Sequence, residues 1–143
     1  MLPMVAKGRT LVYEVIADLR LVVSCQPKGL PTDAEWNRWL TAVEGLQSQY
    51  KQIRLLVASD GGHPTHAQSE RLRARNNTNP LTAIVSSSRS LRFLNSALTF
   101  INPRIRCFSP SELANALEHL GVAYADQERV RMAIEELQRQ LLD

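Results

Sequence analysis

The residues that could do chemistry gather in one stretch, SDGGHPTHAQSERLRA, at positions 59–74. Asp60 is followed by two glycines, and His63 and His66 stand three positions apart with hydroxyl groups on either side. This pattern is compatible with four kinds of site: a metal site, a phosphate-binding loop, a phosphorylation site, or a tight turn that leads into a helix cap. The rest of the chain must decide between them.

A metal site lacks ligands in this sequence. Pro64 and Thr65 begin a helix between the two histidines, and no matching cluster of cysteine or histidine occurs elsewhere. We therefore expect no metal.

Catalysis and cofactor binding lack their usual motifs. The three serines at 86–88 are not part of a GxSxG turn, and no pattern ties His63 or His119 to them. Neither GxxxxGK[ST] nor GxGxxG occurs in the chain. The sequence predicts a protein that is not an enzyme and carries no cofactor.

Polar residues follow the expected strands and would form a rim at one edge of a sheet. In an open α/β sheet, ligands lie at the carboxyl ends of the strands, where helix N-termini point their amides. Such a rim could accept a phosphate or carboxylate, with Arg89 supplying the charge, but tight turns need the same residues without a ligand, and we favour turns. The expected rim consists of Asp60, Gly61, Gly62, His63, Ser86, Ser87, Ser88 and Arg89.

Composition narrows the class of protein. The 143 residues suit one domain, and the two cysteines, Cys25 and Cys107, stand in apolar runs where a thiol behaves as a small hydrophobe. No window is apolar enough to span a membrane, and the first residues lack a secretory pattern, so we expect a cytoplasmic protein. The net charge of +3 is mild, and few aromatics accompany the arginines, so we expect no nucleic-acid partner.

The elements that would position the rim can be read from periodicity. Residues 10–26 predict two strands joined near Ala17 as a hairpin, and 31–50 a helix with a capping box of Thr32 and Glu35. Strands are expected at 53–59, 81–87 and 104–108, the last at an edge. Helices are expected at 64–75, at 90–101, and from Ser109 to Gly121.

The last helix carries a two-heptad apolar seam of Val130, Ile134, Leu137 and Leu141. Two heptads are marginal alone, so the seam must be buried. Docking on its own domain and self-association or partner binding both remain open.

The order of these elements predicts an α/β fold: a mixed, mostly parallel sheet of about five strands that begins with a hairpin, with helices packed on it and an extra C-terminal helix. We expect a tail at 1–9, the domain at 10–122 and the amphipathic helix at 123–143.

The order strand-strand-helix followed by strand-helix units resembles the STAS domain of bacterial anti-sigma factor antagonists. The similarity extends to DGGHPTHAQ, to LTAIVSSSRSLRFLNSALTFINPRIRCFSPSELANALEHLGV and to the Asn-Pro before the last strand, within residues 10–122. It is nearest to a divergent branch that also resembles lipid-binding domains. The resemblance implies a regulatory module in signalling, with a protein partner such as a kinase or an anti-sigma-type regulator.

In that family a Ser or Thr beside an Asp, after the third strand, is phosphorylated. This chain keeps the aspartate but has glycines and a histidine where the hydroxyl would stand. The nearest candidate is Thr65, with Ser69 and Ser59 as lesser ones. Thr65 also has a structural explanation, because it can cap the helix opposite Gln68.

Three functions follow as hypotheses. The first is a non-enzymatic interaction module that uses the helix at 64–75 and its preceding loop. The second is a small-molecule or lipid carrier at the rim of Gly61, Ser86 and Arg89, with apolar space beneath Phe93 and Phe108. The third is an adaptor that forms a homo-oligomer through the C-terminal helix.

Overall fold

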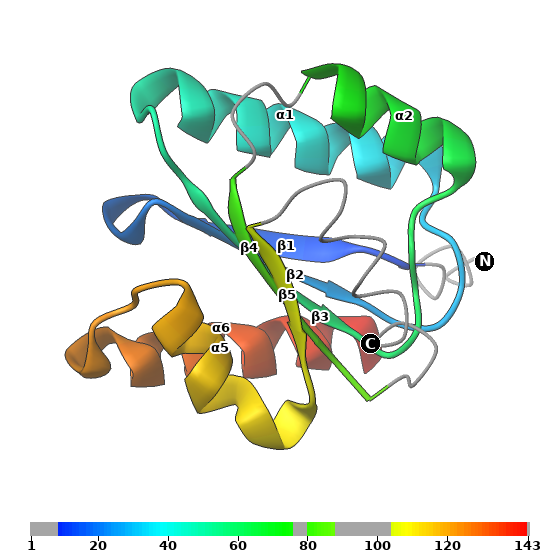
Figure 1. Ribbon diagram of the computed structural model, residues 1–143. Helices are drawn as coiled ribbons and strands as arrows, with labels where there is room; N and C mark the ends of the chain where they lie inside the picture. Colours follow the sequence, from blue (N-terminus) through cyan, green and yellow to red (C-terminus); the bar gives the residue numbers. More distant parts are fainter. Residues whose placement is uncertain (1–8, 76–79, 88–103, 143) are drawn as a thin grey trace.

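A computed structural model describes residues 9–75, 80–87 and 104–142, and these form the expected α/β fold (Figure 1). The strands are β1 (Val12–Ile16), β2 (Leu21–Gln26), β3 (Arg54–Ser59), β4 (Leu81–Ser86) and β5 (Ile105–Phe108). The helices are α1 (Asp33–Gln49), α2 (His66–Arg75), α5 (Leu113–His119) and α6 (Tyr124–Leu142), with short 3-10 turns η2 (Ala17–Leu19) and η3 (Pro110–Glu112).

The five strands lie side by side in the order of the sequence, β1-β2-β3-β4-β5. The first pair is antiparallel, with Val15 opposite Val22, and the other three pairs are parallel. This arrangement confirms the predicted hairpin, the mostly parallel sheet and the edge position of the last strand. The hairpin turns through η2, where the N–H of Arg20 donates to the carbonyl of Ala17 at 3.0 Å.

The sheet is the middle of three layers. α1 and α2 cover one face, and α5 and α6 cover the other (Figure 1). β2 is buried along its whole length because its side chains enter both cores: Val22 packs under α1, whereas Leu21 and Val23 pack toward α5 and α6. This explains why its sequence is continuously apolar rather than alternating.

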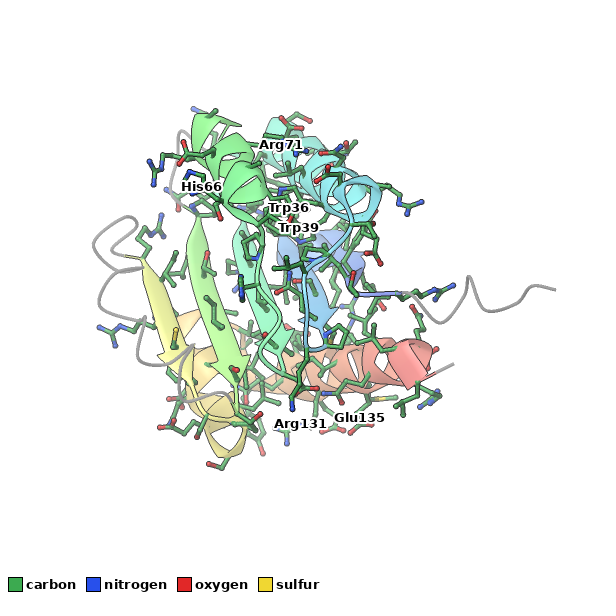
Figure 2. The ribbon with its side chains drawn as sticks, turned by 90° about the vertical axis from the view of Figure 1, so that its right-hand side faces the viewer. Trp36, Trp39, His66, Arg71, Arg131 and Glu135 are labelled. Carbon is green, nitrogen blue, oxygen red and sulfur yellow. The ribbon has the colours of Figure 1, made fainter. Side chains whose placement is uncertain are left out.

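The helix α1 begins as the sequence predicts. The N–H of Glu35 donates to the hydroxyl of Thr32 at 3.1 Å, and the N–H of Thr32 donates to the Glu35 carboxylate at 3.0 Å. Trp36 and Trp39 are buried between α1 and the sheet, with their ring centroids 4.9 Å apart (Figure 2).

The seam on α6 docks on the chain's own sheet. Val130 and Leu137 are at most 1% exposed, Ile134 is buried, and Leu141 packs against the same core as β1 and β2. Val130, Ile134 and Leu137 are therefore covered within the chain and are not available as the expected homo-oligomer interface, whereas Leu141 is only partly buried. α6 belongs to the domain's core because its apolar stripe closes the lower face of the sheet.

Other predicted elements differ in detail or fall outside the described part. The helix expected from Ser109 starts as the 3-10 turn η3 and continues as α5, with Gly121 after its end at φ 73°. The predicted helix at 90–101, together with Phe93, lies outside the described residues. Among those described, no helix is long and apolar enough to cross a membrane.

Candidate functional site

The loop after β3 is shaped by close backbone packing against the loop after β2. Gly61 has φ 116°, and a Cβ at Gly62 would lie 2.0 Å from the carbonyl oxygen of Pro27. The N–H of Asp60 donates to the carbonyl of Gln26 at 2.9 Å. Both glycines are thus required by the turn itself, which supports their interpretation as turn residues.

A buried amide then fixes the start of α2. Gln68 is 1% exposed, and its N–H donates to the hydroxyl of Thr65 at 3.1 Å, while the N–H of Thr65 donates to Oε1 of Gln68 at 3.0 Å. The Nε2 group of Gln68 donates to the carbonyl of Pro31 and to Oδ1 of Asp33, each at 3.0 Å. The predicted capping role of Thr65 is confirmed, and the same cap joins α2 to α1.

Arg71 adds a second link between the two helices. Its guanidinium donates to Asp33 at 3.2 Å and to Asn37 at 3.1 Å. The neighbouring Gln68 amide and Arg71 hold the pKa of the Asp33 carboxyl below its usual range. This end of α2 is therefore held from three sides: by the loop, by the cap and by α1.

The outer side of α2 is open to solvent. Among residues 66–74 of this helix, whose burial is described, only Gln68 is buried, and Leu72 is partly buried against the core under α1. His66 and Arg71 project from this layer, far from α6 on the opposite face (Figure 2). We call the exposed set the α2 face; it consists of His63, His66, Ala67, Glu70 and Arg73.

The three proposed phosphoacceptors differ in access. Ser59 is 4% exposed, and its hydroxyl donates to the carbonyl of Gly62 at 2.7 Å and accepts from the N–H of Gly61 at 3.0 Å. A kinase could reach it only if the loop opened, so Ser59 is the least accessible of the three. Thr65 and Ser69 are half-buried at the start of α2.

A cavity of about 240 Å³ opens at the carboxyl ends of β2, β3 and β4. Of the expected rim, Asp60, Ser86 and Ser87 line it, whereas Gly61, Gly62 and His63 do not. Ser88 and Arg89 lie outside the described residues. The apolar lining includes Leu113, Ile134 and Leu141. Phe108, which was expected to cover such a space, does not line the cavity and is partly buried against the core.

Three polar cavity residues come from α6 and were missed by sequence reasoning. Arg131, Glu135 and Gln138 line the cavity, and Figure 2 shows Arg131 and Glu135 close together on this helix. The Nε atom of Arg131 is buried and has no hydrogen-bond partner among the described residues; its nearest carboxylate, on Glu128, is 3.8 Å away. The sequence could have indicated them, because each of the three directly follows a seam residue. They therefore share the spacing of the seam and lie along one side of it.

The two cysteine thiols and the His119 imidazole lie in structural environments. Burial, helped by the negative charge of Asp60, raises the pKa of the Cys25 thiol to about 12, and burial also raises the pKa of Cys107. Neither thiol is a thiolate at neutral pH, so neither is an activated nucleophile. His119 lies 3.2 Å from the carbonyl oxygens of Thr82 and Arg104, a structural contact between α5 and the sheet.

Metal chemistry has no cluster to support it in the described part of the chain, where no three His, Cys, Asp or Glu side chains come together. His63 and His66 are exposed, and Nδ1 of His63 lies 2.9 Å from the carbonyl of Pro64.

No protein-family model matches this chain, and comparison with curated proteins and with solved structures finds no match.

Proposed function

We propose that this chain is a non-enzymatic regulatory module that binds a protein partner through the α2 face. One observation carries the proposal: close packing and hydrogen bonds fix the backbone of the loop and the start of α2, while the side chains of the α2 face remain exposed and, except for Ala67, polar. A surface that is already ordered loses little conformational entropy when a partner binds. The STAS resemblance in element order points to the same surface.

The charge of α2 indicates the chemistry of the partner. The helix contains Arg71, Arg73 and Arg75 against one acidic residue, Glu70. Glu70 lies 3.5 Å from Arg73, and Arg71 is paired with Asp33 across the helices. Counted over α2 and Asp33, three arginines against two carboxylates leave a net charge of +1. This excess fits an acidic patch on the partner, which would accelerate association and make it sensitive to salt.

Phosphorylation would act at the start of the same helix. A phosphate on Thr65 adds about −1.5 to −2 charges at an N-terminus that attracts anions, and converts the hydroxyl oxygen that accepts from the N–H of Gln68 into a phosphate ester oxygen. The α2 face would become negatively charged at this end. We propose Thr65, and secondarily Ser69, as the residue through which a kinase in a cytoplasmic signalling circuit would switch the partner.

The experiment compares tagged proteins expressed in the organism that encodes the chain. The variant is Ala67→Glu, which adds a negative charge to the α2 face, and the control is Met132→Glu on the exposed side of α6. We expect a stoichiometric partner with wild type and control and its loss with Ala67→Glu. The purified partner should also bind Thr65→Glu less tightly than Thr65→Ala. Equal capture by Ala67→Glu and wild type would overturn the proposal.

The cavity at the carboxyl edge supports a second candidate function, a carrier of a small amphipathic molecule. Its lining combines an apolar wall with Arg131, whose buried Nε has no hydrogen-bond partner within the described structure and only a 3.8 Å ion pair with Glu128. Native mass spectrometry of protein purified from its own cells tests this. A bound mass should be present in wild type and in Arg139→Ala, an exposed position on the same helix, and absent from Arg131→Ala. Wild type without a bound mass would count against the carrier.

A further inference from the structure

A basic hollow lies at the end of the sheet opposite the candidate site. It encloses about 470 Å³ and is lined by Arg20, Arg54 and Arg104, with Asp18 and Gln52 between them. The arginines come from the β1–β2 turn, the start of β3 and the residue before β5. The hairpin turn and the connection from α5 to α6 lie at the same end of the molecule (Figure 1). We call this surface the arginine hollow.

Arg54 is fixed in place but not neutralised. Its guanidinium donates to the carbonyls of Leu19, at 3.1 Å from Nε, and of Leu120, at 2.9 Å. Both acceptors are uncharged, so the positive charge remains. Burial and the nearby charge of Arg20 lower the pKa of Arg54, as expected where like charges face each other.

Arg20 occupies a position where an arginine is costly. Its φ is 53°, the only positive φ of a non-glycine residue in the described structure. The left-handed conformation costs an L-residue roughly 1–2 kcal/mol that glycine would not lose. Its guanidinium lies 4.7 Å from the ring centroid of Tyr50, which orients the charge. Glycine would form this turn without the conformational cost. The presence of arginine therefore points to a role for its side chain.

Three arginines and one acidic residue, Asp18, contribute to the lining of the hollow. Both carboxylate oxygens of Asp18 accept from Arg129, at 2.6 and 2.7 Å. The negative charge of Asp126 acts on both neighbouring arginines: it raises the pKa of Arg129 and opposes the lowering of the pKa of Arg54. The hollow therefore keeps an excess of positive charge.

We propose that the arginine hollow binds a small free anion with several negative charges, of the diphosphate type. Guanidinium groups present paired N–H donors that match phosphate oxygens, and several of them can share a multivalent anion. Arg54 forms the rigid floor and Arg20 and Arg104 the sides. This site is separate from the α2 face, so the proposal of anion binding does not depend on the proposed function.

Isothermal titration calorimetry tests the proposal with two probes, inorganic phosphate and pyrophosphate. Wild type should bind pyrophosphate in the millimolar range or tighter, and about tenfold tighter than phosphate, because the longer anion reaches more than one arginine. No binding of pyrophosphate, or no preference over phosphate, would overturn the proposal.

The decisive variant is Arg20→Gly, which removes the charge while it relieves the backbone. It should raise the free energy of unfolding yet weaken pyrophosphate binding about tenfold, the loss of one charge-assisted contact. Arg73→Gln removes an equal charge from α2 and should leave both unchanged. Equal weakening by both variants would show a general charge effect and no site. Unchanged affinity in Arg20→Gly would also contradict the proposal.

Discussion

The amide nitrogen of Gln68 lies 3.0 Å from Oδ1 of Asp33 and joins two helices through a side chain that is only 1% exposed. Every polar atom of this amide has a partner, since Oε1 accepts from the N–H of Thr65 and Nε2 also donates to Pro31. A buried amide with complete hydrogen bonding links the two helices specifically, because an apolar replacement would leave its partners without hydrogen bonds.

Replacement of this amide should destabilise the fold strongly. Gln68→Ala leaves the carbonyl of Pro31 without its donor and opens a void, so we predict a loss of about 2–3 kcal/mol in the free energy of unfolding. Urea denaturation measures this loss. The control, Glu70→Ala, changes an exposed neighbour on α2 and should alter stability by less than about 0.5 kcal/mol. Similar losses in both variants would show that Gln68 does not fasten the helices.

Two glycines should respond oppositely to the same substitution. A Cβ at Gly62 would meet the Pro27 carbonyl at 2.0 Å, so Gly62→Ala must move the loop and should destabilise by more than about 2 kcal/mol. Gly45 lies within α1 with nothing within 4 Å of its added Cβ, so Gly45→Ala should stabilise by about 0.5–1 kcal/mol. Thermal unfolding of both variants checks the signs. A stable Gly62→Ala would mean that the loop is not closely packed.

Acid should weaken the link between the first strand and α1. Burial favours a raised pKa for Glu35, but hydrogen bonds from Thr10 and Thr32 outweigh it, so the folded-state pKa lies below 4.5. The carboxylate therefore contributes stability that is fully present above about pH 4.5 and is lost as pH falls through the folded-state pKa. Glu35→Gln should be less stable than wild type at pH 7 and should lose less of its stability between pH 6 and acid. Parallel pH profiles of the two proteins would contradict this role.

The thiol of Cys25 should resist modification in the native protein. Its pKa of about 12 and its 2% exposure leave neither thiolate nor access. In Cys107→Ser, which isolates this thiol, a disulfide reagent at pH 8 should react only at the rate of unfolding and should react at once in denaturant. Rapid labelling of the native variant would show that the β2–α6 contact opens.

Much of the fold follows from local pattern. The capping box of Thr32 and Glu35, the continuous apolar run of β2 and the short edge strand β5 each carry a sequence signal that depends on near neighbours. The choice between burial and self-association for the α6 seam could not be made this way. The apolar heptad pattern is the same whether the helix packs on the chain's own sheet or on a second copy of the chain.

The candidate site was less predictable because it depends on contacts between distant residues. The turn after β3 was identified, but the obstacle to a Cβ at Gly62 comes from Pro27, and the fastening of Gln68 comes from Asp33. Ser59 looked as accessible as Thr65 in the sequence, yet its hydroxyl is enclosed by the turn that it stabilises. The sequence near Arg20 does not indicate the proposed anion site, because that site depends on Arg54, which is distant in the sequence.

Site-specific photo-crosslinking in living cells tests the central claim, that a protein partner binds the α2 face. A photoreactive phenylalanine analogue would be placed at position 67 on α2 or at position 132 on α6, both exposed. We predict one discrete covalent adduct from position 67 and none from position 132. An adduct from position 132 alone, or none from position 67, would contradict the account.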